Sequence, residues 1–334
     1  MKRNEVSNSV KKPFPDFSDR RLWEPLFACP LCQSADFRKT FDTRDRHYGN
    51  PGVFQVMRCG GCGVYFLNPM PTLEYLKNAY PRDYYAYSVP SPSRATSSVR
   101  KRIPECIRRL ILFTSGWTRD PEFPAPGSVL DIGCGAGRFL LEMRKRGWTV
   151  RGVELDSDAA AAGKHEGLEI FAGTLHDAAF PPATFDYVRS NHSFEHIHNP
   201  REVLREIRRI VRPGGRLFIG VPNLAGLMPK VWGTYWWYLG APVHTYGYTP
   251  ASIARLLTEE GFRVERISCN STYAGVTGSL QIWLNRNNGR GSEEGWVVKN
   301  PALRVFGHWL AQFIDLFRAG DCMEVIARPV TRDE

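Results

Sequence analysis

The stretch VLDIGCGAGRFL, residues 129–140, constrains the fold more than any other part of the sequence. Its apolar run ends in three glycines at alternate positions, Gly133, Gly135 and Gly137, and a helical pattern begins directly after them. From there on, strand-like and helix-like segments alternate, and CMEVIARP, residues 322–329, is one more strand-like run. Such alternation predicts an α/β fold with a doubly wound, mostly parallel sheet of seven strands, in which one late strand runs antiparallel.

Four of the eight cysteines form two pairs with the spacing of a metal-binding module. CPLC and CGGC each let two thiolates face one ion from a single tight turn, and 26 residues separate the pairs. We therefore predict a zinc-ribbon module over residues 26–70 that holds a structural zinc ion. A closed four-thiolate site leaves no position for a substrate, so we expect this zinc to fold the module and not to catalyse. The predicted ligands are Cys29, Cys32, Cys59 and Cys62.

The remaining segments differ in composition. Residues 1–25 form a basic tail, residues 71–124 a connecting segment with a basic helix, and residues 125–334 the α/β domain, in which segment 224–248 is rich in aromatic side chains. The basic helix can lie on a membrane surface, but we favour its packing on the following domain. Without a secretory signal or an apolar run of about 18 residues, we expect a cytoplasmic protein with no transmembrane segment.

The net charge of +10, from 44 Lys+Arg against 34 Asp+Glu, favours anionic partners such as nucleic acid, phosphorylated substrates or a membrane surface. Much of the excess lies in the tail and between residues 94 and 109. Because this distribution makes no single basic stripe, we do not expect nucleic acid to be the partner.

The glycine turn points to a ligand at the carboxyl ends of the strands. Glycine lets the backbone approach a ligand closely, and the helix after it presents N–H groups. A dinucleotide-binding turn would need a third glycine where Arg138 stands, and the lysine of a phosphate-binding loop is missing. Two acids complete the site: Asp131 ends the first strand and can face an ammonium group, and Glu154 ends the second and can hold both hydroxyls of a ribose.

At this point the sequence resembles the class I S-adenosylmethionine-dependent methyltransferases. The motifs DIGCGAG, GVELD, AGTLHDAAFPPATFDYV, EHIHNP, VRPGGRLFIGVPN and GYTPASIARLLTEEGFRV stand in the order of that family. The resemblance covers residues 128–268, and GDCMEVIARP is similar to the closing strand of the family. It implies that S-adenosyl-L-methionine is the cofactor and that the protein is an enzyme that transfers a methyl group.

The resemblance also implies a cofactor pocket, residue by residue. The three glycines would lie against the methionine part with the first acid beside them, and the second acid would hold the ribose. Two residues after the third strand would lie beside the adenine, and one after the fourth would flank the sulfonium end. These residues are Asp131, Gly133, Gly135, Gly137, Glu154, Thr174, Leu175 and Asn191.

A hydroxyl acceptor must lose a proton, and histidine is the usual general base near neutral pH. Three candidates stand out: His192 just after the fourth strand, His196 beside Glu195, and His244 after the aromatic run VWGTYWWYLGAPVH. For His196, an interior histidine bonded to the backbone is an equal alternative.

The same histidines can be interpreted as metal ligands in two ways. HSFEH, residues 192–196, matches the H-x-x-E-H metalloprotease pattern, which we reject because the methyltransferase motifs explain these residues. The segment is also similar to the Glu-x-x-Glu-His of quinone O-methyltransferases, which bind a divalent ion there. Since His192 replaces the first acid, we do not expect a second metal.

The acceptor is indicated only in outline. The layout is similar to deoxysugar C-methyltransferases, but Val243 stands where those carry Glu. This departure favours O-methylation. Similar chains with an aromatic run before the histidine resemble enzymes of surface-glycan or natural-product pathways, which implies a small, sugar-like acceptor. Two other functions stay open: an RNA methyltransferase that uses the zinc module and the basic charge, and a non-catalytic protein that binds zinc and cofactor.

Two apolar segments have more than one interpretation. The aromatic residues 232–238 can form a lid, stack on a sugar or pack on the sheet, and they can also dock a membrane or a partner. Residues 302–317, ALRVFGHWLAQFIDLF, predict an amphipathic helix, which we expect to cover the core and not to contact a membrane.

Overall fold

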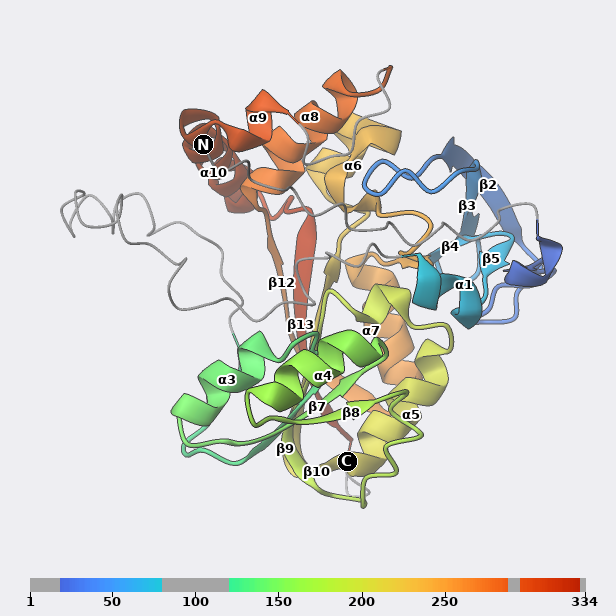
Figure 1. Cartoon of the computed structure of the whole chain (residues 1–334). Coiled ribbons are helices and arrows are strands. Elements are labelled where there is room, and N and C mark those ends of the chain that lie inside the picture. The colour runs from blue at the N-terminus through green and yellow to red at the C-terminus, as the bar shows by residue number, and fades with distance from the viewer. Residues whose placement is uncertain (1–18, 80–119, 288–294, 331–334) are drawn as a thin grey trace, which may run out of the picture.

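The computed structural model describes residues 19–79, 120–287 and 295–330 (Figure 1). The predicted basic helix and nearly all of the predicted tail lie outside these ranges. A seven-stranded sheet forms the centre of the molecule. Its strands are β6 (Ser128–Ile132), β7 (Thr149–Glu154), β8 (Glu169–Ala172), β9 (Phe185–Asn191), β10 (Val211–Pro222), β12 (Phe262–Asn270) and β13 (Cys322–Pro329).

The strand order is β12-β13-β10-β9-β6-β7-β8, and five neighbouring strands, from β10 to β8, run parallel. Strand β13 is antiparallel to both β10 and β12. This arrangement confirms the predicted doubly wound, mostly parallel sheet with one late antiparallel strand. The order reverses between β6 and β9, so the carboxyl ends of these two strands bound the crevice in which such sheets bind ligands.

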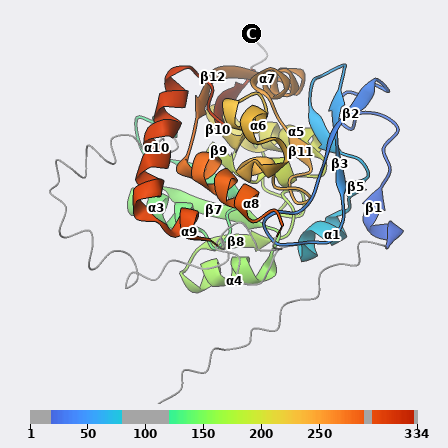
Figure 2. The same ribbon diagram turned by 90° about the horizontal axis from the view of Figure 1, so that it is seen from above.

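Helices cover both faces of the sheet. In Figure 2, α3 (Arg138–Lys145) lies on one side, and α5 (Pro200–Ile210) and α7 (Pro250–Glu259) lie on the other. The main core joins apolar residues of α5 and α7 to alternate residues of the strands, such as Leu130 and Val188. Helix α4 (Ser157–His165) packs against β8 at the edge. This double covering leaves most residues of β6 and β9 buried.

A second, four-stranded sheet lies in the N-terminal module, in the order β11-β4-β3-β2. Short segments surround it, and β1 pairs with β5. Strand β2 contains mostly exposed or half-buried residues, so its sequence carries no strong apolar pattern. The elements are β1 (Trp23–Glu24), β2 (Phe37–Thr43), β3 (Phe54–Cys59), β4 (Tyr65–Leu67), β5 (Met70–Pro71), α1 (Leu73–Asn78) and β11 (Tyr246–Gly247).

Four further helices gather beyond the end of β10, at the top of Figure 1. They are α6 (Leu227–Trp232), α8 (Ser279–Leu284), α9 (Trp296–Lys299) and α10 (Pro301–Leu316). Helix α10 buries Gly307, Ala311 and Ile314 and packs through them on the cluster around Trp236, as expected of a helix that covers core, but its other side stays exposed. Within the described ranges, no helix combines the length and the apolar character needed to cross a membrane.

Candidate active site and metal centre

Four thiols meet in the N-terminal module. Cys29 Sγ lies 3.6 Å from Cys62 Sγ, and Cys32 Sγ lies 3.4 Å from Cys59 Sγ. All four sulfur atoms lie within 4.8 Å of one another. Four thiolates at the usual Zn–S length of about 2.3 Å stand about 3.8 Å apart in a tetrahedron. The four predicted ligands therefore fit a zinc ion.

The module is joined to the α/β domain by a shared sheet, because β11 pairs with β4. The N–H of Leu67 in β4 donates to the carbonyl of Thr245, and the N–H of Thr245 donates to the carbonyl of Glu195 at 3.0 Å. Arg201 and Arg255 donate to carbonyl groups in the two cysteine turns. A short chain of hydrogen bonds thus connects the four-cysteine module to Glu195.

The glycine turn after β6 adopts a left-handed backbone. Gly133, Gly135 and Gly137 have φ values of +70°, +53° and +79°. A Cβ added to Gly133 would stand 2.4 Å from Ser193 Cβ, and one added to Gly137 would stand 2.2 Å from Leu168 Cδ1. Glycine is therefore required here both by the dihedral angles and by close packing.

Glu154 ends β7 and supports this turn. Its Oε2 accepts a hydrogen bond from the Gly135 N–H at 2.8 Å, and its Oε1 accepts one from the Asp156 N–H at 2.9 Å. Burial raises the pKa of this carboxyl, and the two backbone donors act in the opposite direction. Because each carboxylate oxygen can accept more than one hydrogen bond, Glu154 keeps the capacity to bind a pair of hydroxyls.

Asp131 forms a buried ion pair that the sequence analysis did not anticipate. Its Oδ1 lies 3.2 Å from Arg189 Nη1, and the Arg189 guanidinium lies 4.1 Å from the centre of the Phe139 ring. Burial raises the pKa of Asp131 to about 6, while the Arg189 charge works against this rise. The protein itself therefore supplies a cation to the carboxylate for which we expected a ligand ammonium group.

The other predicted cofactor residues lie at the ends of β8 and β9. Thr174 donates from its hydroxyl to Asp177 Oδ2 at 2.6 Å. Leu175 is buried in the main core. Asn191 is half-buried at the end of β9, where it is the register partner of Gly220. Since β6, β7, β8 and β9 are adjacent and parallel, the turns that carry these residues open on one edge of the sheet.

A buried carboxylate surrounded by imidazoles lies just after β9. Glu195 is 1% exposed, and its Oε1 lies 3.6 Å from His192 Nδ1, 3.9 Å from His244 Nε2 and 4.0 Å from His196 Nε2. The rings of His196 and His244 meet edge to face at 4.6 Å. The structure thus brings the three predicted histidines together around Glu195, which the sequence analysis did not choose as a site residue.

The three histidines are anchored differently. His196 Nδ1 lies 2.8 Å from the Val243 carbonyl oxygen, and His244 Nδ1 lies 3.0 Å from the Tyr238 carbonyl oxygen. The predicted alternative for His196, a backbone-bonded interior ring, is therefore seen. His192 has a φ of +51°, and its side chain is 38% exposed. A left-handed non-glycine residue costs roughly 1–2 kcal/mol, and such strain concentrates at functional sites.

The protonation states follow from burial and mutual contacts. Burial favours a raised pKa for Glu195, but the imidazoles of His192, His196 and His244 lower this pKa to about 2. Burial, followed by the proximity of His196, lowers the pKa of His244 to about 3. At neutral pH, Glu195 is therefore ionised and His244 is uncharged.

The same cluster has the donor set of a metal site. Glu195, His196 and His244 each offer one ligand atom within 4.8 Å of the others. Neither oxygen of the Glu195 side chain has a hydrogen-bond partner within 3.5 Å among the described residues. A carboxylate with two imidazoles suits a divalent transition ion, so these residues fit one although the sequence analysis expected none.

The aromatic segment lies between the histidines and the upper helices. The ring of Tyr238 stacks on that of His192 with 5.8 Å between centres, and its hydroxyl lies 2.6 Å from Thr272 Oγ1. Trp236 is buried against Met228, Val276 and residues of α10. Trp236 is thus packed inside the protein, whereas Tyr238 also contacts the histidine cluster.

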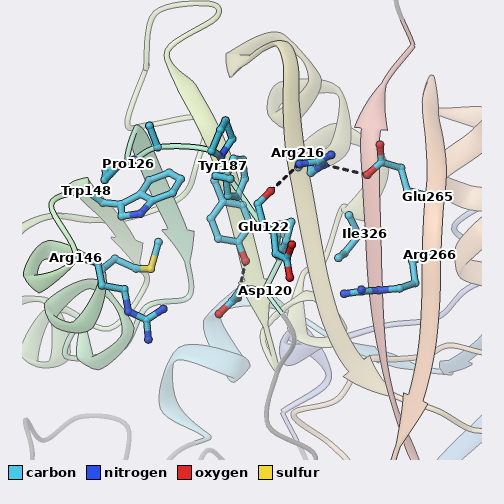
Figure 3. Close-up of a pocket in the computed structure, with 15 residues that line it drawn as sticks. Asp120, Glu122, Pro126, Arg146, Trp148, Tyr187, Arg216, Glu265, Arg266 and Ile326 are labelled. Carbon is cyan, nitrogen blue, oxygen red and sulfur yellow. Dashed lines mark hydrogen bonds and ion pairs between the residues drawn. The ribbon is translucent and has the colours of Figure 1, made fainter.

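A separate groove lies on the α3 side of the sheet, lined by residues from the amino-terminal parts of β9 and β10 (Figure 3). Its polar side chains bind one another: Tyr187 donates to Asp120 Oδ1 at 2.7 Å, and Arg216 bridges the Glu122 carbonyl and the Glu265 carboxylate. None of the predicted site residues lines this groove.

A glycine turn and an acid at the ends of neighbouring parallel strands define the class of α/β proteins that bind a nucleoside-containing cofactor. A family model described as a methyltransferase domain matches residues 99–267, half of the chain. The chain therefore belongs to this methyltransferase family. It is an S-adenosylmethionine-dependent methyltransferase, as the resemblance of its motifs implied.

The chain is similar to several known proteins. A ubiquinone biosynthesis O-methyltransferase of Aeromonas salmonicida is 31% identical over 47% of this chain and 71% of its own length. One from Thiobacillus denitrificans is 30% identical over 47% of this chain and 74% of its own. A solved SAM-dependent methyltransferase from Archaeoglobus fulgidus is 21% identical, covers 67% of this chain and 91% of its own, and has a TM-score of 0.43. The four-cysteine segment lies outside the family match.

Proposed function

We propose that the protein methylates a hydroxyl group of a small polar acceptor and that His192 is the general base. The observation that carries this proposal is the pairing of His192 with the buried Glu195 carboxylate, 3.6 Å from its Nδ1, directly after β9. A base oriented by a carboxylate beside the cofactor edge is the arrangement that proton removal from a hydroxyl requires.

The cofactor is held by the predicted residues at the ends of β6 to β9. Bound S-adenosyl-L-methionine supplies a methyl group activated on a sulfonium. Gly133, Gly135 and Gly137 allow the close approach of the backbone, and Glu154 accepts hydrogen bonds from the ribose hydroxyls. Thr174 and Leu175 border the adenine, Asn191 flanks the sulfonium end, and Asp131 fixes the turn through its ion pair with Arg189.

The protein then has two tasks, to align the acceptor and to take up its proton. As the methyl group leaves the sulfonium sulfur, which keeps the electron pair of that bond, and joins the acceptor oxygen, the hydroxyl proton would pass to Nε2 of His192, because Nδ1 faces Glu195. The ionised Glu195 stabilises the imidazolium. His196 and His244, bonded to backbone oxygens, keep Glu195 in place and act as positioning residues. A divalent ion at Glu195, His196 and His244 would polarise the acceptor oxygen.

The acceptor is a sugar-like molecule in this proposal. Tyr238 stacks beside His192, and an aromatic face next to a base suits the apolar face of a sugar ring. A second candidate is a phenolic precursor of a quinone, which the names of the two relatives favour. A phenol uses the same base and stacks on the same aromatic ring.

The N-terminal module has a structural role in this proposal. Residues 26–70 hold one zinc ion through Cys29, Cys32, Cys59 and Cys62, and residues 125–334 form the catalytic domain. The hydrogen bonds from β4 through Thr245 to Glu195 let the module support the histidine cluster.

The test is transfer of a labelled methyl group from S-adenosylmethionine to a panel of sugars and phenols. We expect His192→Asn to lower kcat by about 100-fold or more, since a positioned base contributes 10²–10⁴-fold. The affinity for S-adenosylmethionine should not change. His165→Asn, an exposed histidine at the end of α4, is the matched control and should keep the parent rate. Full activity of His192→Asn, or no labelled hydroxyl product with any acceptor, would refute the proposal.

A further inference from the structure

The loop between β2 and β3 of the four-cysteine module reaches the α/β domain. In Figure 1 this loop, drawn in blue, extends from its sheet toward α6. Asp45 is buried in it, and its Oδ1 accepts hydrogen bonds from the N–H of His47 at 2.8 Å and of Tyr48 at 3.0 Å. Its Oδ2 accepts one from the N–H of Asn50 at 3.0 Å. A carboxylate that binds the backbone of its own turn fixes that turn. We call residues 45–50 the module loop.

Two consecutive residues of the module loop contact the aromatic residues that follow α6. The Arg46 guanidinium lies 4.7 Å from the centre of the Tyr235 ring. His47 Nε2 lies 2.6 Å from the Trp237 carbonyl oxygen, and the rings of these two residues meet edge to face at 4.9 Å. The module loop therefore contacts both the side chains and the backbone of this segment.

The hydrogen bond between His47 and Trp237 has a defined donor. A backbone carbonyl oxygen only accepts, so Nε2 of His47 carries a proton. The neutral ring with its proton on Nε2 and the imidazolium both donate this bond. The Trp237 N–H in turn donates to Ser279 Oγ, at the start of α8, at 2.9 Å. Trp237 is thus bound through its carbonyl to the module and through its N–H to α8.

Trp237 directly precedes the aromatic residue that borders the proposed base. The ring of Tyr238 stacks on that of His192 with 5.8 Å between centres. The Tyr238 carbonyl oxygen lies 3.0 Å from His244 Nδ1. A shift of the backbone at Trp237 therefore moves both the ring beside His192 and the oxygen that anchors His244.

Other contacts dock the module on the domain. Strand β4 pairs with β11, and Arg201 and Arg255 bind carbonyl groups of the two cysteine turns. Docking by these contacts alone would leave residues 235–238 without a partner from the module. The module loop differs from them in its target, which is the residue before Tyr238. This placement indicates a role at the acceptor site in addition to docking.

We propose that the module takes part in acceptor recognition and that His47 is a positioning residue, which holds Tyr238 against His192 through the carbonyl of Trp237. This role rests on the proposed function, since it takes the surroundings of His192 as the place of the acceptor. The loop acts on the binding of the acceptor and not on that of the cofactor, whose proposed residues lie in the turns after β6 to β9.

The first test is steady-state kinetics with the acceptor that the labelled-methyl assay identifies. His47→Phe keeps a ring beside Trp237 and removes the donor. We expect the KM for the acceptor to rise about three- to tenfold, which corresponds to the loss of one hydrogen bond. The value of kcat should change less than KM, and the dissociation constant of S-adenosylmethionine should stay the same. His47→Gln, whose amide N–H can reach the same carbonyl, should restore most of the parent KM.

The second test needs no acceptor. Hydrogen–deuterium exchange followed by mass spectrometry reports local opening of peptides that cover residues 235–244. His47→Phe should speed the exchange of this segment, and His47→Gln should keep the parent rate. The matched control is His198→Gln, because His198 is a half-buried histidine that joins the domain to the module at another point, with its Nε2 3.2 Å from Glu24 Oε2. This control should keep both the parent exchange and the parent KM.

The outcomes separate the possible failures, and thermal unfolding checks that each variant is folded. Unchanged exchange of residues 235–244 in His47→Phe would show that His47 does not anchor the segment. Faster exchange with an unchanged KM for the acceptor, or a weakened affinity for S-adenosylmethionine, would overturn the role in acceptor recognition. If the parent transfers no methyl group to any hydroxyl acceptor, the proposed function fails and the acceptor role falls with it, whereas the exchange measurement still decides whether His47 anchors the segment.

Discussion

At the scale of single residues, the most informative groups are buried carboxyl groups whose pKa values are shifted from the ordinary range. Glu195 stays charged because imidazoles surround it, and Asp131 has Arg189 beside it. Asp321, just before β13, is buried, and a hydrogen bond of 3.3 Å from Trp236 Nε1 together with backbone donors offsets this burial only in part. The three buried carboxyl groups thus have three different surroundings within one fold.

Asp321 gives a prediction about pH. Burial raises its pKa to about 7 in the folded protein, above the ordinary value of 3.8. A raised folded-state pKa means that the contribution to stability is complete below about pH 4 and is lost as the pH rises through about 7. Asp321→Asn, whose amide oxygen can still accept from Trp236, should remove this loss. The free energy of unfolding of the variant minus that of the parent should therefore rise between pH 4 and pH 7, by a few kcal/mol in total.

The measurement is denaturant unfolding of both proteins across this pH range. Asp158→Asn, at an exposed position in α4, is the control and should give a profile parallel to that of the parent. A parallel profile for Asp321→Asn would show that the buried carboxyl does not change its charge in this window.

At the scale of elements, the sequence predicted most of the fold. Strands β6 to β10 and helices α3, α4, α5 and α7 were found because their apolar periodicity and their turns agree. Strand β11 is two residues long and owes its pairing to β4, so no local pattern reveals it. The exposed face of α10 was missed because periodicity shows that a helix has an apolar side but not whether protein covers it.

The candidate site was predicted in the same uneven way. The glycines and Glu154 belong to local turns between a strand and a helix. Their positions along the sequence were therefore enough to predict them as site residues. The grouping of His192 and His244 depends on how the chain after β10 returns to β9, which no spacing encodes. Two sequence signals included Glu195: the pattern H-x-x-E-H, in which it stands between two of the candidate bases, and the similarity to the Glu-x-x-Glu-His of quinone O-methyltransferases.

The glycine turn offers a test at this scale. Gly137 and Gly214 both have a φ of +79°, but an added Cβ meets Leu168 at 2.2 Å in the first case and nothing within 4 Å in the second. Gly214→Ala should therefore cost only the left-handed backbone penalty, about 1–2 kcal/mol. Gly137→Ala should cost this and a further 1–3 kcal/mol for overpacking against β8. Urea unfolding of the two variants decides the matter, and equal losses would show that Leu168 moves aside freely.

At the scale of the whole molecule, the module and the catalytic domain act as one unit. Removal of the metal should loosen β4, then Thr245, and so the carbonyl of Glu195. We expect Cys59→Ala to lose about one equivalent of zinc, to lower the free energy of unfolding and to reduce methyl transfer, although Cys59 lies outside the proposed cofactor pocket. Metal content by emission spectrometry, unfolding and the methyl-transfer assay measure the three effects.

The matched control for this experiment is Cys269→Ala, which removes a partly buried thiol in β12 and should keep the zinc. If Cys59→Ala loses the zinc and retains the full rate of methyl transfer, the module does not support the histidine cluster.

The pairing of β11 with β4 limits how this protein can be divided. A shortened version that begins after residue 70 would leave the backbone groups of Tyr246 and Gly247 unpaired at a strand edge. Such an exposed edge promotes aggregation. Grafting the cysteine segment onto another enzyme would fail for the complementary reason, because its sheet would lack its last strand. We therefore expect each part to be less stable without the other.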